Sequence, residues 1–253
     1  MNLSIYEKGE GKAILLIHGF PMNASIWNKF SARLSSSFKV ISVDLPGFGG
    51  SPLLPGQFSL EDVADVIIKN LKRKEISQVI PIGHSLGGYV VLAMVNKAPE
   101  LFPGFGLFHS TALADSPEKK ESRNKVIEFI KKNGGKAFTS NFIAPLFSNS
   151  EHPDVPFVRE MNMKTEAPTL IAYLKAMRDR QDKLDLLESF KKPILIIAGA
   201  KDPGIPVSSI HEQSRLSSNV TVKILGDQAH MGLVEDVETT SSIVYEFVSN
   251  CYN

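Results

Sequence analysis

The fold of this chain is decided by Val79-Ile80-Pro81-Ile82-Gly83-His84-Ser85-Leu86-Gly87-Gly88. An apolar run ends at Gly83 and a second apolar segment begins at Leu86, so the pattern predicts a strand that turns sharply into a helix. Glycine, serine and glycine at 83, 85 and 87 match the G-x-S-x-G pattern of a nucleophile elbow. Larger side chains at 83 and 87 would collide in such a turn, and glycine removes both collisions. The turn therefore presents the hydroxyl of Ser85 to a substrate.

Pro81 lies inside this predicted strand, where proline removes a hydrogen-bond donor from the sheet. Either the strand bulges at Pro81, or the missing N–H would have faced no partner. The sequence leaves both explanations open.

The rest of the chain alternates between strand-like and helix-like patterns. Ser59 and Asp62 form a capping signal for the clearest amphipathic helix, whose apolar residues run from Leu60 to Leu71. The first strand-like run is broken by Gly9-Glu10-Gly11, which suggests a hairpin at a sheet edge. Further strands are expected at residues 3–6, 13–17, 38–43, 105–108, 193–199 and 220–225. This alternation predicts an α/β fold, with a mostly parallel sheet covered by helices on both faces.

The composition changes between about Ala112 and Phe190, where strand-like runs disappear and helical segments rich in Lys, Glu and Met take over. We therefore expect a core formed by residues 1–111 and 191–253, with residues 112–190 inserted in it as a helical cap, or lid. The lid is expected to line an apolar pocket with Phe138, Phe142, Phe147, Phe157, Met161 and Met163.

Composition and charge exclude several classes of protein. A hydrophobic fraction of 43% in 253 residues suffices for a large core. The net charge of +1 argues against nucleic acid and anionic membranes as partners. A single cysteine, Cys251, rules out a disulfide within the chain. With no visible signal peptide, no run of about 20 apolar residues and no metal-ligand spacing, we expect a cytoplasmic protein without a membrane span.

A serine nucleophile needs a base, usually a histidine that a carboxylate orients. The candidates for the base are His18, His84, His109, His152, His211 and His230. His230 follows the last predicted strand and Asp202 follows the strand at 193–199, and sites gather at such strand ends. Ser85, Asp202 and His230 also occur in the chain order of the nucleophile-elbow class. We predict these three as the catalytic residues, with Asp115 as the second choice for the acid.

Two backbone N–H groups are expected to bind the oxyanion of the tetrahedral intermediate. Leu86 provides one at the start of the helix, and Phe20 provides the other in the loop after the strand at 13–17. Further pocket residues are predicted at Trp27, His109, Leu113, Phe142, Phe147 and Met231.

Over essentially its whole length the chain resembles an α/β-hydrolase of the cap-bearing, esterase-like branch. The resemblance is carried by the elbow at 83–88, by His18-Gly19-Phe20-Pro21, by Asp44-Leu45-Pro46-Gly47-Phe48-Gly49-Gly50-Ser51, and by Met177-Arg178-Asp179-Arg180 followed by residues 193–202. It implies an eight-stranded, mostly parallel sheet and no metal or organic cofactor.

Hydrolysis of a small-molecule carboxylic ester with a small to medium acyl group, through a Ser85 acyl-enzyme, is the leading expectation. Serine at 85 argues against the branches of the family that use an aspartate nucleophile. Four alternatives stay open: carbon–carbon bond hydrolysis, the elimination step of menaquinone biosynthesis, perhydrolysis, and a hydrolase-fold ligand receptor. The first two reactions require the enzyme to bind a carboxylate of the substrate. Arg123, Arg159 and Arg178 are candidates for binding it. The oligomeric state is not predicted.

Overall fold

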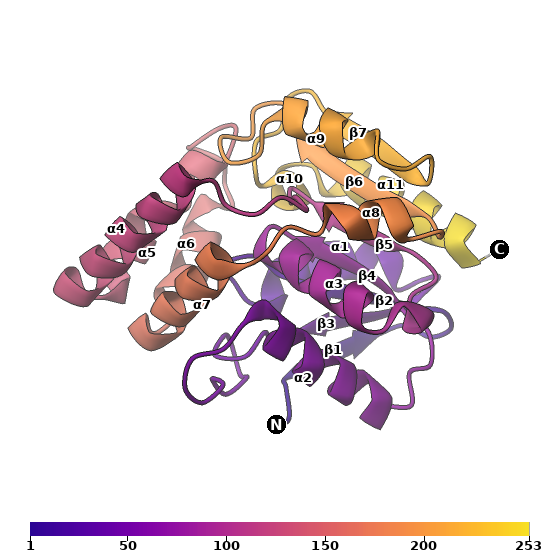
Figure 1. Ribbon diagram of the computed structural model, residues 1–253, viewed down its shortest axis with the longest axis horizontal. Coiled ribbons are helices and arrows are strands. Elements are labelled where there is room, and N and C mark those ends of the chain that lie inside the picture. The colour runs from indigo at the N-terminus through magenta and orange to yellow at the C-terminus, as the bar shows by residue number, and fades with distance from the viewer. Residues whose placement is uncertain (253) are drawn as a thin grey trace.

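One seven-stranded sheet forms the centre of the computed structural model, which describes residues 1–252 (Figure 1). The strand order is β1-β3-β2-β4-β5-β6-β7, and every neighbouring pair is parallel except β1 and β3. The strands are β1 (Ile5–Lys8), β2 (Ala13–Ile17), β3 (Lys39–Val43), β4 (Ile80–His84), β5 (Phe105–Phe108), β6 (Ile194–Gly199) and β7 (Val220–Leu225). The predicted α/β class is confirmed.

Two expectations about the edge of the sheet were wrong. Within residues 1–252 the sheet has seven strands and not the eight implied by the resemblance, since β1 alone lies beyond β3 there. The residues before β1 bond elsewhere: the Ser4 N–H donates to Ser51 Oγ, and the Leu3 N–H donates to Asn70 Oδ1. Nor does β1 form a hairpin with β2, since it crosses over to pair with β3, in the register Ile5 opposite Val43.

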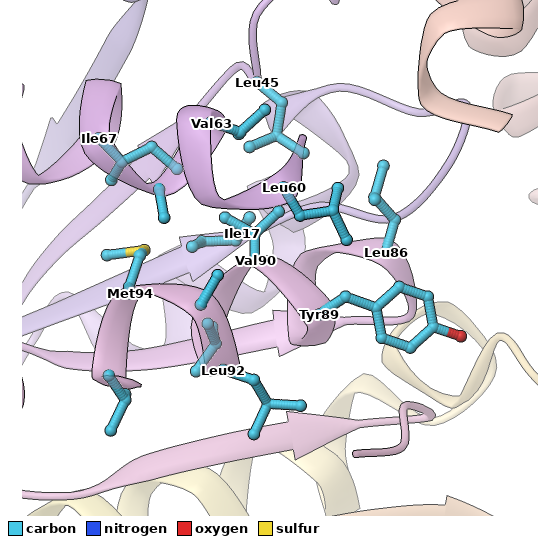
Figure 2. Close-up of a cluster of buried hydrophobic side chains, with 14 of the residues drawn as sticks. Ile17, Leu45, Leu60, Val63, Ile67, Leu86, Tyr89, Val90, Leu92 and Met94 are labelled. Atoms are coloured by element: carbon cyan, nitrogen blue, oxygen red, sulfur yellow. The ribbon is translucent and has the colours of Figure 1, made fainter. Parts of the chain in front are cut away.

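Helices cover both faces of the sheet. Outside residues 112–190 they are η1 (Ala24–Trp27), α1 (Asn28–Leu34), α2 (Leu60–Arg73), α3 (Leu86–Lys97), η2 (Pro99–Leu101), α9 (Val207–Ser214), α10 (Gly232–Glu235) and α11 (Val237–Tyr252). Helices α2 and α3 bury their apolar faces against Ile17 and its neighbours in one core cluster (Figure 2), whereas α1 and α11 pack with Ile14 and Leu16 on the other face. The predicted capping box of Ser59 and Asp62 begins α2. Within residues 1–252 no helix is long and apolar enough to cross a membrane.

Pro81 lies in β4 without costing the sheet a backbone hydrogen bond. The N–H groups of Val79 and Ser85 both point towards the β5 side of β4, where they donate to carbonyls of Leu101 and Phe108. Because N–H directions alternate along a strand, position 81 faces the same side. Pairing with β5 begins only at Ile82, so proline stands where no β5 acceptor is in register.

Between β5 and β6 the chain forms helices only, and α4 to α7 lie together on one side of the sheet (Figure 1). They are α4 (Pro117–Asn133), α5 (Gly135–Phe142), η3 (Ala144–Leu146), α6 (Val155–Met163), α7 (Ala167–Asp179) and α8 (Leu184–Ser189). The predicted lid begins at Ala112, whose carbonyl accepts from the Lys183 N–H at 2.8 Å. Beyond that bond, α8 buries Leu186 and Leu187 in the core cluster of α2 and α3.

Candidate active site

Ser85 stands between the end of β4 and the start of α3, as the sequence predicts. Its backbone adopts φ 51° and ψ −113°, a strained conformation for a residue with a side chain. A Cβ at Gly83 would lie 2.3 Å from the Gly87 backbone, and one at Gly87 would lie 2.3 Å from the Ile17 carbonyl oxygen. Glycine at both positions is therefore what lets the turn close.

Asp202 and His230 meet at the same edge of the sheet. Nδ1 of His230 lies 2.7 Å from Oδ2 of Asp202. The other oxygen of Asp202 accepts hydrogen bonds from the backbone N–H groups of Gly204 and Ile205, which fix the carboxylate. With its Nδ1–H directed at Asp202, the His230 imidazole keeps Nε2 as an acceptor.

His84 brings His230 to the elbow. Nε2 of His84 lies 2.8 Å from the His230 carbonyl oxygen, and the two rings are 5.1 Å apart. Because His84 directly precedes Ser85, this hydrogen bond ties the loop that carries His230 to the strand that carries the serine. His84 was predicted only as a candidate base, and this contact was missed.

His109 occupies a place that the sequence did not predict. Its Nδ1 lies 3.5 Å from Oδ2 of Asp202, and its ring nitrogens lie 3.1 and 3.2 Å from the backbone nitrogens of Gly199 and Gly232. A neutral imidazole accepts at one nitrogen and donates at the other, so only one of these two N–H groups can donate to His109. His109 is fully buried, and its backbone has a φ of 47°. It contacts the carboxylate and the loops around it.

The four residues follow four adjacent strands. Ser85 comes after β4, His109 after β5, Asp202 after β6, and His230 after the loop that leaves β7. Carboxyl ends of parallel strands share one edge of a sheet, which is why residues far apart in the sequence gather here.

Burial and hydrogen bonding set the charges of the cluster. Burial lowers the pKa of His84 well below its usual value, and the nearby His230 and His109 lower it further. Burial also lowers the pKa of His109, against the opposing effect of its contact with Asp202. Burial alone would raise the pKa of Asp202, but the two histidines outweigh burial and hold it below its usual value. Asp202 is therefore a carboxylate at neutral pH, and the buried His84 and His109 are neutral.

The two predicted oxyanion donors lie at the starts of their segments. Leu86 is the first residue of α3, so its N–H is among those without a partner inside the helix. Phe20 lies in the loop after β2, and His18 stabilises this loop with two hydrogen bonds. Its Nδ1 donates to the Gly19 carbonyl, and its Nε2 accepts from the Leu45 N–H. Burial lowers the pKa of His18 to about 4, so this imidazole is neutral.

The lid contacts the site at three places. The His230 N–H donates to the carbonyl of Leu146 at 2.9 Å. Thr165 donates from Oγ1 to the Pro21 carbonyl at 2.9 Å. The ring of Phe20 packs against Phe138 and Phe142 of α5, with ring centroids 6.3 and 5.9 Å apart. The lid thus lies directly on the loops after β2 and β7.

The remaining predicted pocket residues lie in different surroundings. Trp27 and Met231 are fully buried in the core cluster of α1 and α11, where Trp27 packs against Phe30 and Phe108. Phe147 is buried in the lid and stacks on His152. The Leu113 carbonyl accepts from Arg180 where the lid begins. One lid residue was placed wrongly: Phe157 is 48% exposed and lines a surface groove beside α10 instead of an inner pocket.

Asp115, the second choice for the acid, lies away from the histidines. It forms ion pairs with Arg123 and, at 2.7 Å, with Arg180. The Arg180 guanidinium also lies 3.9 Å from the ring centre of Tyr89. These contacts join the two ends of the lid to α3.

A family model described as alpha/beta hydrolase fold matches residues 12–237. The chain is similar to a pimeloyl-(acyl-carrier protein) methyl ester esterase of Methylococcus capsulatus, with 26% identity over 99% of this chain and 100% of the relative. It is also similar to a 2-(acetamidomethylene)succinate hydrolase of Mesorhizobium japonicum, with 22% identity over 98% and 92% of the two chains. Among solved structures, a thermophilic esterase of Thermogutta terrifontis superposes with a TM-score of 0.93 at 28% identity, over 99% and 94% of the two chains.

Proposed function

This chain belongs to the α/β-hydrolase fold family, and on that premise we propose that it hydrolyses carboxylic esters through an acyl-enzyme on Ser85. The observation that carries the proposal is the 2.7 Å contact between His230 and Asp202, beside an elbow that holds Ser85 in a strained conformation.

In the first half of the reaction, Nε2 of His230 takes the proton of the Ser85 hydroxyl as its oxygen attacks the ester carbonyl. Asp202 accepts from Nδ1, keeps the ring in the required tautomer and stabilises the imidazolium that forms. The N–H groups of Leu86 and Phe20 stabilise the oxyanion. When the intermediate collapses, His230 returns the proton to the leaving alcohol and Ser85 carries the acyl group.

In the second half, water replaces the alcohol. His230 takes a proton from the water, whose oxygen attacks the acyl carbonyl, and the same two N–H groups stabilise the second oxyanion. Collapse breaks the bond to Ser85, the proton returns to the serine oxygen, and the carboxylic acid leaves.

The contacts made by residues 112–190 favour a substrate whose acyl group is of small to medium size. We propose that residues 112–190 act as a cap, in which the rings of Phe138 and Phe142 at Phe20 make an apolar surface beside the oxyanion donors. The methyl ester esterase relative supports an ester substrate with a small alcohol.

The two alternatives that require binding of a substrate carboxylate, carbon–carbon bond hydrolysis and the elimination step, have less support. Arg123 is paired with Asp115, and Arg178 bonds Asp179 and Asn124, so both candidate guanidinium groups already have partners. Arg159 lies at an exposed position of α6.

A fluorophosphonate probe followed by peptide mapping tests the proposal. We expect one labelled peptide, containing Ser85, and hydrolysis of p-nitrophenyl acetate that stops when labelling is complete. Label on another residue, or undiminished hydrolysis after labelling, would refute the Ser85 assignment.

A further inference from the structure

His84, the residue before Ser85, has a fully buried imidazole that lies between two loops of the site. Its Nε2 lies 2.8 Å from the His230 carbonyl oxygen. Along another edge of the ring, Nδ1 faces Gly19, because a Cβ at Gly19 would lie 2.5 Å from Nδ1 and 3.1 Å from Cε1. The ring therefore fills the space between the loop that carries the proposed base and the loop that carries Phe20.

The contact with His230 determines which nitrogen of His84 carries the proton. A carbonyl oxygen only accepts, so Nε2 is the donor and Nδ1 of the neutral ring bears a lone pair. Within residues 1–252 this Nδ1 has no hydrogen-bond partner. A buried nitrogen without a partner costs stability, and a hydrocarbon side chain would fill the space without that cost. What the imidazole offers instead is the hydrogen bond from Nε2.

The backbone and side chain of His230 are held at three points. Its Nδ1 contacts Asp202, its N–H donates to the Leu146 carbonyl, and its carbonyl accepts from His84. Of these three, the bond to His84 is the one that joins His230 to the strand bearing Ser85. The Ser85 N–H in turn donates to a carbonyl of β5 at 2.9 Å, so the elbow is a fixed reference for the base.

We propose that His84 is a positioning residue, which places His230 against Ser85 through its hydrogen bond to the His230 carbonyl, and that glycine at 19 provides the space for its ring. This role rests on the proposed ester hydrolysis. Because His84 acts through His230, it matters most in the step where His230 must deliver a proton in a defined direction. That step is protonation of the leaving alcohol.

Ethyl acetate and p-nitrophenyl acetate separate this role from a general loss of structure. Both esters form the same acetyl-enzyme, but ethoxide needs a proton from His230 to leave, whereas p-nitrophenolate leaves unprotonated. His84→Phe keeps a ring and removes the donor. We expect it to lower kcat/KM for ethyl acetate about tenfold more than for p-nitrophenyl acetate, the size of one hydrogen bond. His84→Gln can place an amide N–H where Nε2 stands, so it should restore most of the wild-type ratio of the two values.

Gly19→Ala tests the space around the ring. A Cβ only 2.5 Å from Nδ1 displaces the imidazole, so this variant should shift the ratio in the same direction as His84→Phe. Combined with His84→Phe it should shift the ratio no further, because the hydrogen bond is already absent. Asn70→Leu is the matched structural control. It takes the acceptor from the buried Leu3 N–H, so it should lower the melting temperature and leave the ratio at the wild-type value.

A wild-type ratio in His84→Phe, or a His84→Gln variant as impaired as His84→Phe, would overturn the role of His84 and leave the hydrolase proposal standing. If His84→Phe does not fold, His84→Leu and Gly19→Ala carry the same expectation. If the wild type hydrolyses neither ester and the fluorophosphonate labels no serine, the proposed function itself fails and the role of His84 falls with it.

Discussion

The backbone N–H of His230 donates to the carbonyl of Leu146 at 2.9 Å, so the lid holds the proposed base directly. A second contact lies close by, where the Ser148 N–H donates to Oε1 of Glu235 at 2.8 Å. These hydrogen bonds join the end of η3 and the residues just after it to the chain around His230.

Glu235→Ala should loosen this junction. Losing the acceptor of Ser148 should cost the closed lid about 1 kcal/mol and lower kcat/KM roughly fivefold. Amide hydrogen exchange in the peptides around Leu146 and His230 should speed up together. Glu235→Gln keeps an acceptor oxygen and serves as the control; equal exchange rates in the two variants would show that Glu235 does not hold the lid.

The two candidate acids should separate into different phenotypes. Asp202→Asn leaves His230 in the wrong tautomer and should lower kcat about 10⁴-fold. Asp115→Asn weakens buried ion pairs to Arg123 and Arg180, so it should lower the free energy of unfolding by about 3 kcal/mol and keep most of the activity. Steady-state kinetics and urea unfolding of both variants decide the assignment. A larger loss of kcat in Asp115→Asn would reverse it.

His109 was predicted as a pocket residue, and its contact with Asp202 argues for a positioning role instead. If it positions Asp202, His109→Asn should lower kcat by roughly tenfold, the worth of one hydrogen bond to a charged group, for every acyl chain length. A pocket residue would change KM, and change it differently for short and long chains. A series of p-nitrophenyl esters from acetate to octanoate distinguishes the two.

Ser85 should be a strained position. Ser85→Gly should unfold at a higher urea concentration than Ser85→Ala, by about 1 kcal/mol in free energy of unfolding, because only glycine adopts φ 51° and ψ −113° without strain. Both variants should be inactive. Equal stability of the two would mean that the turn relaxes when the hydroxyl is absent.

Buried neutral histidines should make the protein sensitive to acid. His18 has a pKa of about 4 when folded and about 6.5 when unfolded, because burial disfavours its charged form. Between these values the unfolded chain binds a proton that the folded chain does not, so stability falls as the pH drops. His18 alone accounts for about 3 kcal/mol over that range, and the lowered pKa values of His84 and His109 act in the same direction.

Urea unfolding between pH 7.5 and pH 5.0 measures the slope of the free energy of unfolding against pH. His18→Asn should flatten it, whereas His211→Asn, a change at an exposed position of α9, should leave it as in the wild type. A free energy of unfolding that stays constant over this range would contradict the expected proton uptake.

Local patterns sufficed to predict most of the fold. Strands buried on both faces read as continuous apolar runs, and the glycines at 83 and 87 stand where the structure leaves no room for a Cβ. The pairing of β1 with β3 was missed because a pairing partner is set by the path of the whole chain and not by the strand itself.

The parts of the site that escaped prediction depend on contacts between distant elements. The contact of His109 with Asp202 exists because β5 and β6 are neighbours in the sheet, which the order of the strands along the chain does not determine.

The hydrogen bond between Lys183 and Ala112 has a consequence for how such proteins diversify. Because the intervening helices leave and rejoin the chain at one point, a short peptide can bridge the gap when they are excised, and a foreign insert with close ends can take their place. Recombination at this single junction would exchange the helices between residues 113 and 182 as one unit and leave the seven strands of the sheet in place.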